Sequence, residues 1–159
     1  MGVGLKSKGQ ISIEFILIIL IVLIYIHSVI QPTAKAAAQS TEDVARLAQT
    51  KLAAQKLGAA INELQANQSD GKKTIELFVP KDGTVTCNGS ANVIEFSATM
   101  SSLRNPQGCT NKVCSGSVKL ITGAGSGLSC FGGSNASNVF REVTVSKTNS
   151  GIDVSYVST

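Results

Sequence analysis

One long apolar run near the N-terminus constrains what this chain can fold into more than any other feature. The twenty residues from Ile11 to Ile30 include four clearly polar side chains: Ser12, Glu14, His27 and Ser28. An α-helix rises about 1.5 Å per residue, so a helix of this length spans about 30 Å, the thickness of the hydrocarbon core of a bilayer. The sequence therefore predicts one helix that can cross a membrane.

The charges around this run predict its orientation. Lys6 and Lys8 precede it, and basic residues mark the cytoplasmic flank of a membrane helix. Everything after Ile30 is therefore expected outside the cytoplasm. The net charge is +4, and the charged residues are scattered along the chain. No basic cluster indicates a nucleic-acid partner.

A second helical stretch with one apolar stripe follows. Pro32 lacks an amide hydrogen and disfavours helical geometry in the residue before it, so we expect a kink near Pro32. Residues 33–66 are rich in good helix formers. Apolar residues recur there at steps of three, four and seven: Val44, Leu47, Ala54, Leu57, Ile61 and Leu64. We predict a long helix over residues 10–66, with 10–30 in the membrane and 33–66 amphipathic.

The helical pattern ends at Asn67, and β-branched runs divided by Gly, Asn and Ser follow. They predict strands near Thr74–Val79, Thr84–Cys87, Val93–Thr99, Val113–Thr122, Val139–Ser146 and Ile152–Val157. Hairpin turns are expected at residues 81–83 and at 148–151, the latter joining the last two strands. The expected fold class is α+β, a long N-terminal hydrophobic helix with a C-terminal antiparallel β head over residues 67–159.

The four cysteines all lie in the part predicted to be outside the cell: Cys87, Cys109, Cys114 and Cys130. An oxidising compartment and an even count favour two disulfides, and three connectivities remain open. A zinc site is disfavoured because Cys109 and Cys114 lack the usual two-residue ligand spacing and no histidine accompanies them. A head with so small a core is expected to rely on such bridges.

Three Asn-x-Ser sequons lie on the same side, and they make candidate N-glycosylation sites of Asn67, Asn88 and Asn135. Catalytic signals are weak by comparison. The glycine-rich stretch 123–127 has no Lys-Ser or Lys-Thr of a phosphate loop. His27, the single histidine, lies in the apolar run, where an interfacial or interhelical hydrogen bond is expected. We therefore expect no enzyme, no metal and no cofactor.

The nine residues before the apolar run form a leader rather than a structural element, because they are short, basic and rich in glycine. A cut between Gly9 and Gln10 would create a positively charged amine at Gln10, one helical turn from Glu14. A carboxylate in a membrane helix needs a partner, and this amine or that of a neighbouring subunit can supply one. The alternative is an ordinary secretory cleavage at the small residues 34–38, which would discard the apolar run.

Gln10, Ser12 and Glu14, with Lys6 and Lys8 upstream, resemble the start of archaeal type IV pilin precursors, in which a class III signal peptide precedes Gln-x-Ser-x-Glu. The resemblance covers about the first twenty residues. It departs from the family at Ile18, where leucine often stands, a chemically minor change. Archaellins are related but usually lack this pattern, which favours a pilus over an archaellum.

The resemblance implies processing by a prepilin peptidase, with Gly9 and Gln10 at the cut and Lys6 and Lys8 before it. It also implies storage in the membrane lipid, then assembly by a membrane platform and an ATPase into a helical homopolymer of this chain outside the cell. The residues implied in assembly are Gln10, Ser12, Glu14, Phe15, Ile16, Leu17, Leu20 and Leu23. The expected function is that of major subunit of an adhesive pilus. The alternatives are a minor pilin or pseudopilin of a secretion or assembly machine, and a single-pass surface binding protein.

Overall fold

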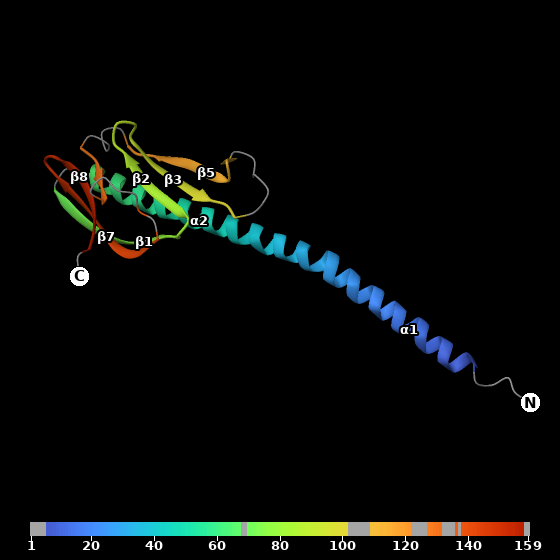
Figure 1. Cartoon of the computed structure of the whole chain (residues 1–159). Coiled ribbons are helices and arrows are strands. Elements are labelled where there is room, and N and C mark those ends of the chain that lie inside the picture. Colours follow the sequence, from blue (N-terminus) through green and yellow to red (C-terminus); the bar gives the residue numbers. More distant parts are fainter. Residues whose placement is uncertain are drawn as a thin grey trace, which may run out of the picture. The chain divides into compact units, whose positions relative to one another are not determined.

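The computed structural model of the chain describes residues 6–67, 70–101, 109–121, 127–131, 136 and 138–157, with residues 6–12 described by their backbone only. It divides the chain into two compact units, Met1–Ser40 and Thr41–Thr159. The C-terminal part of the second long helix therefore belongs to the head. Figure 1 labels the helices and strands named below.

The first unit is helical and contains a π-helical turn. Helix α1 (Lys6–Tyr25) runs into a π-helix, η1 (Ile26–Ile30), after which α2 (Gln31–Ala66) begins. The Gln31 N–H donates to the carbonyl of Ile26, five residues earlier. This widening lies just before Pro32, whose ring crowds the carbonyl four residues earlier and which lacks an N–H of its own. The Thr33 hydroxyl lies 2.9 Å from the carbonyl of Ile30 and so provides a further donor at this turn.

The second unit combines the C-terminal part of α2 with two four-stranded sheets. One sheet has the order β1 (Gly71–Val79), β7 (Val139–Thr148), β8 (Gly151–Tyr156), β6 (Ser129–Cys130). The other has the order β2 (Gly83–Asn88), β3 (Val93–Thr99), β5 (Val113–Lys119), β4 (Cys109–Thr110). The fold is α+β, as predicted. Among the strands described, β6 and β8 form the one parallel pair.

All six predicted strands occur, with ends shifted by a few residues, whereas the two-residue strands β4 and β6 were not predicted. Thr122, at the end of one predicted strand, lies outside the described residues. The turn at residues 148–151 does join β7 and β8, with Thr148 opposite Gly151. The prediction of a hairpin at residues 81–83 is wrong. Strand β1 pairs with β7 and β2 with β3, so this turn carries the chain from one sheet to the other. Turn residues reverse the chain, but they do not select the strand that pairs with it.

The predicted stripe on α2 packs against both sheets, with one correction at its beginning. Leu57 and Ile61 are fully buried, and Leu64 is 5% exposed, whereas Val44 is 67% exposed. Counting back from Leu64 in alternating steps of three and four residues gives the buried or half-buried positions Ile61, Leu57, Ala54, Thr50, Leu47 and Asp43. The stripe thus continues through two polar residues, because helical geometry rather than apolar character decides which positions face the sheets.

Two glycines make room for neighbouring side chains in the head. A Cβ atom at Gly58 of α2 would lie 3.1 Å from Val118 of β5, so the glycine brings the helix close to this strand. A Cβ atom at Gly116 of β5 would lie 2.6 Å from the ring of Phe96 on β3. Phe96 is buried, so its ring fills the space that a side chain at Gly116 would occupy.

Substituting Gly116 is therefore expected to destabilise the head. We expect Gly116→Val to lower the free energy of unfolding by about 2 kcal/mol, because the core cannot expand around Phe96 without strain. Ser115→Val on the same strand is the matched control, since Ser115 is exposed and should tolerate the change. Denaturant unfolding of the detergent-solubilised chain compares the two, and equal stabilities would contradict this account of the packing.

Both expected disulfides form. Cys87 at the end of β2 is bonded to Cys130 of β6, and this bridge links the two sheets. Cys109 is bonded to Cys114 directly across the β4–β5 hairpin. This pairing selects one of the three connectivities that the sequence leaves open.

Candidate functional site

The apolar helix presents side chains to its surroundings on every side. All residues from Ile13 to Ile30 are exposed, including Phe15 at 63% and Leu20 at 50%. The helix is long and apolar enough to cross a membrane by length and composition. A helix that is apolar all round requires lipid or other protein around it. The chain by itself therefore leaves this surface uncovered in the part that the structure describes.

The predicted assembly residues lie along α1. Ile16, Leu20 and Leu23 follow one another at steps of four and three residues and so share one face of the helix, while Phe15 and Leu17 flank it. All five side chains are exposed.

The start of the same helix contains the predicted processing residues together with Ser12, a predicted assembly residue. Lys6, Lys8, Gly9, Gln10 and Ser12 belong to α1 by their backbone, and their side chains lie outside the described part. Gln10 and Glu14 are one helical turn apart, the separation at which an amine at Gln10 can meet the carboxylate. Glu14 itself is exposed between Ile13 and Phe15.

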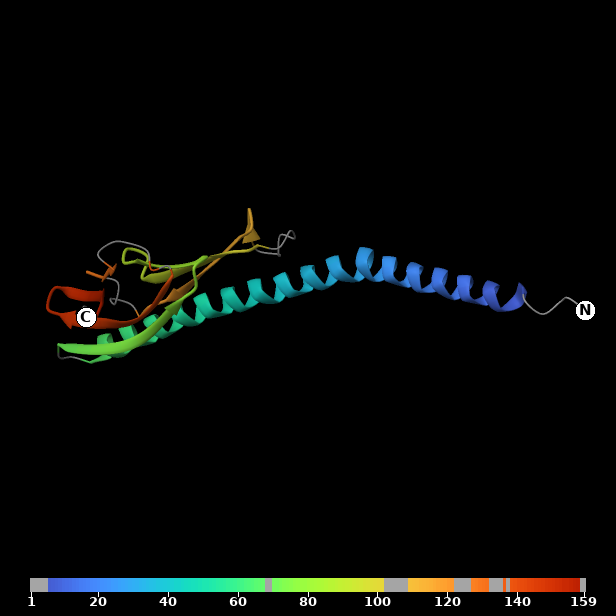
Figure 2. The ribbon, with the colours of Figure 1, turned by 60° about the horizontal axis from the view of Figure 1, so that its bottom comes forward.

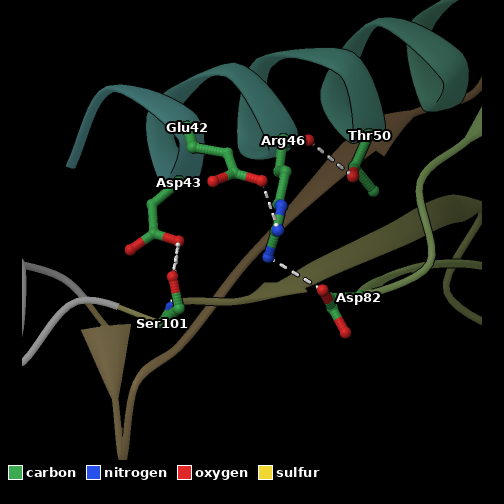
Figure 3. Close-up of polar contacts among 6 residues, drawn as sticks. All are labelled: Glu42, Asp43, Arg46, Thr50, Asp82 and Ser101. Atoms are coloured by element: carbon green, nitrogen blue, oxygen red, sulfur yellow. Dashed lines mark hydrogen bonds and ion pairs between the residues drawn. The ribbon is translucent and has the colours of Figure 1, made fainter. Parts of the chain in front are cut away.

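A group of polar residues ties α2 to the rest of the head near the beginning of the head unit, and Figure 3 shows it. We call the two contacts Asp43–Ser101 and Arg46–Asp82 the polar clasp. An Asp43 carboxylate oxygen accepts hydrogen bonds from the Ser101 backbone N–H at 2.9 Å and from its hydroxyl at 2.8 Å. Arg46 pairs with Asp82 at 2.8 Å and with Glu42 at 2.6 Å. The hydrogen bond to Glu42 raises the pKa of Arg46 above its ordinary value.

The sequence analysis missed the clasp, although a signal for it was present. Asp43 and Thr50 occupy positions in the three-and-four spacing of the α2 stripe where an apolar residue is expected. Asp43 is 3% exposed, and its hydrogen bonds to Ser101 compensate for burial. Thr50 donates to the carbonyl of Arg46 at 2.8 Å. Its hydroxyl lies 2.4 Å from where a Cβ atom at Gly83 would be, so only glycine fits there.

Removing the Asp43 carboxylate is expected to loosen this end of the head. We expect Asp43→Ala to lower the free energy of unfolding by about 2 kcal/mol, because the Ser101 N–H loses its acceptor and a buried space opens. Val44→Ala is the control, since the neighbouring side chain is exposed and should contribute little. Thermal unfolding of the full chain in detergent measures both. If Val44→Ala lowered the stability more than Asp43→Ala, the assignment of Asp43 rather than Val44 to the buried stripe would be wrong.

Four contacts hold the other end of α2 to the first sheet and to the chain after β5. The Lys147 ammonium on β7 donates to the carbonyls of Gln65 at 3.4 Å and of Asn67, where a helix end exposes unpaired carbonyls. Lys73 pairs with Glu63. The amide oxygen of Asn62 accepts from the Ile121 N–H at 2.8 Å. The helix end is thus attached to two strands of the first sheet and to the chain just after β5.

The candidate glycosylation sites differ in their surroundings. Asn67 is exposed just after α2. Asn88 is half-buried, and its amide nitrogen, the atom that a glycan would bond to, donates to Glu95 at 3.1 Å. Its amide oxygen accepts from the Ala91 N–H at 3.1 Å and from the Ser90 hydroxyl at 3.2 Å. Asn135 lies outside the described residues. Glycosylation of all three stays a prediction.

Comparison with protein families gives one result, which falls on the apolar helix. Residues 7–26 match the family model described as Class III signal peptide. Comparisons with curated proteins and with solved structures found no match. The match confirms the resemblance to type IV pilin-like precursors and indicates a substrate of a prepilin peptidase and of pilus-type assembly machinery. Together with the exposed apolar helix, it indicates a membrane-anchored precursor of a secreted surface protein.

Proposed function

We propose that this chain, a type IV pilin-like precursor with a class III signal peptide, is the major structural subunit of an archaeal pilus and that the pilus serves adhesion. The observation that carries the proposal is the uncovered apolar helix on a chain whose other unit is a folded, disulfide-bonded head. In this proposal the role is structural rather than catalytic. Cleavage before Gln10 leaves the apolar helix attached, so the mature chain keeps the apolar surface through which subunits would pack together.

The environment of the apolar helix changes during assembly in this proposal. In the membrane the lipid tails cover it, and in the filament the same surface packs against the helices of neighbouring subunits. Exposure of apolar area to water costs about 25 cal/mol per Å², so a subunit that left the filament for water would lose heavily. Lipid is as apolar as the helix, so the exchange of lipid for protein brings little hydrophobic gain. An external energy source, the assembly ATPase, is consistent with this balance.

Glu14 supplies the specificity of the first contact in this proposal. A carboxylate inside lipid or inside a filament core is unfavourable unless it is paired. The amine released at Gln10 of a neighbouring subunit is a partner of opposite charge that exists only after cleavage. Processing would therefore prepare the chain for assembly, and an uncut precursor would lack the cation.

The N-terminal residue of the surface-exposed protein tests the proposal most directly. We expect mass spectrometry of filaments sheared from cells to find this chain as the most abundant component, beginning at Gln10. Sedimentation of the sheared fraction should place it in the pellet rather than with monomers. A start beyond Ala34 would contradict the proposal, because the apolar helix would have been discarded. Trace amounts within filaments built of another chain would instead favour the minor pilin.

Adhesion requires a separate test because polymerisation does not imply it. We expect cells that lack this chain to attach less to solid surfaces than cells that express it. Cells expressing Glu14→Val provide a control that keeps the chain in the membrane but removes filaments. Equal attachment in all three strains would contradict the adhesive role while leaving the structural one intact.

A further inference from the structure

Two exposed aromatic rings lie side by side on the outer face of the first sheet. Phe78 of β1 and Phe140 of β7 face each other across the strands, with ring centroids 6.0 Å apart and planes at 69°. Their side chains are 44% and 77% exposed. In the next row of the same face, Glu76 lies opposite Glu142, and both are exposed. We call these four residues the acidic aromatic patch.

The patch has two features that an external partner would relieve. Like charges directly opposite each other on neighbouring strands destabilise a sheet, and none of the ion pairs in the described part of the chain includes Glu76 or Glu142. Exposed aromatic rings beside each other offer apolar area that water solvates poorly. A fitting partner therefore carries a cation next to an apolar side chain.

The β4–β5 hairpin of the other sheet presents such a pair. Lys112 is exposed at its tip, and the adjacent Val113 is 39% exposed. Asn111 and Lys112 have φ values of 50° and 65°, a left-handed backbone that is unfavourable for lysine. The Cys109–Cys114 disulfide closes this hairpin, and the Met100 N–H donates to the Lys112 carbonyl at 2.8 Å. The tip is thus held in one conformation before it meets a partner, which lowers the entropic cost of binding.

The patch and the tip lie at the same end of the head but in different sheets. Phe78 of the patch lies four residues before Asp82, which pairs with Arg46, and the Lys112 carbonyl of the tip accepts from Met100, next to Ser101 of the polar clasp. Figures 1 and 2 show β1 and β5 on different sides of the C-terminal part of α2. A contact between two different surfaces of identical chains is heterologous, so it leaves one patch and one tip free and can propagate along a polymer.

We propose that the hairpin tip of one head docks on the acidic aromatic patch of a second copy, with Lys112 between the two carboxylates and Val113 against the phenylalanine rings. This inference rests on the proposed function, because the filament brings many copies of the head together. In the filament, this docking adds a lateral contact between heads to the packing of the apolar helices. It gives the two carboxylates a cation and the two phenylalanine rings an apolar side chain to pack against.

Charge reversal in the full-length chain tests the docking. We expect Lys112→Glu, and separately the double change Glu76→Lys with Glu142→Lys, to lower the filament mass pelleted at low ionic strength by about fivefold, since a contact of this kind contributes about 1 kcal/mol per subunit. Combining all three changes should restore most of the filament. Lys119→Glu on β5 is the matched control, because this lysine is also exposed but lies at the far end of the strand from the tip.

Each outcome distinguishes this inference from the proposed function. If the wild-type chain forms filaments and both charge-reversed variants give the same yield, the docking is overturned and the proposed pilus function stands. A lower filament yield from each charge-reversed variant, without recovery when all three changes are combined, would also overturn the docking. A wild-type chain that never pellets as filaments would refute the proposed function itself, and the docking with it. Unfolding midpoints of the detergent-solubilised variants should match the wild type, which separates lost docking from a misfolded head.

Discussion

A Glu14→Val chain is expected to be cleaved normally before Gln10 and to form no filaments. The change removes the carboxylate but leaves the helix more apolar, so membrane insertion and processing should continue. In the filament, the amine of a neighbouring Gln10 would then lie in apolar surroundings without its partner. Leaving one charge of a buried pair uncompensated costs about 3–5 kcal/mol, which lowers the equilibrium constant for each added subunit by at least about a hundredfold.

Two measurements are needed for this variant. Mass spectrometry of the membrane fraction should detect the mature N-terminus, and electron microscopy with sedimentation should detect no polymer. Glu14→Asp is the matched control, because it keeps the charge on a shorter side chain and should retain some filaments. Normal fibres from Glu14→Val would refute the charge pair, whereas an uncleaved precursor would show that Glu14 acts in processing instead.

The second large effect is expected when the Cys87–Cys130 disulfide is removed. This bridge joins residues 43 positions apart in sequence, and the bridge between Cys109 and Cys114 joins residues 5 apart. A cross-link stabilises the fold more when it closes a longer loop in the unfolded chain, by about 4 kcal/mol for a loop of the first size and about 2 kcal/mol for one of the second. We therefore expect changing both Cys87 and Cys130 to alanine to lower the free energy of unfolding much more than changing Cys109 and Cys114.

Denaturant unfolding of the full chain in detergent compares the two double-alanine variants with the wild type. The long-range variant should lose about twice as much free energy of unfolding as the hairpin variant. It should also accumulate less protein in cells, because it breaks the one disulfide that joins the two sheets among the described residues. Equal losses would show that loop closure does not control the stability of this head.

Much of the fold could be predicted because local patterns carry it. Leu57, Ile61 and Leu64 recur at helical spacing and are buried in the core, and the runs of Val, Ile and Thr became strands close to where they were expected. Turn chemistry identified the β7–β8 hairpin but failed at Gly83, where the chain changes sheet. The candidate assembly helix was predictable for the same reason, since an uninterrupted apolar run needs no tertiary context to be recognised.

The acidic aromatic patch and the polar clasp could not be predicted in this way. Phe78 and Phe140 are 62 residues apart in the sequence and become neighbours only through the register of β1 with β7. The spacing of the stripe includes Asp43, but nothing in the sequence identifies its partner, Ser101, which is 58 residues away and donates two hydrogen bonds to it. Both sites depend on contacts between segments far apart in the chain, which single-sequence patterns do not specify.

Side-chain polarity and spacing are enough to predict a basic leader, a helix apolar enough for a membrane and a β-rich region with an even number of cysteines. These properties depend on a few turns or strands at a time. The folded chain was needed to show which cysteines pair, that Asp43 rather than Val44 faces the sheets from α2, and which exposed residues stand together. Those choices come from packing between distant segments, where the burial of one side chain depends on all of its neighbours at once.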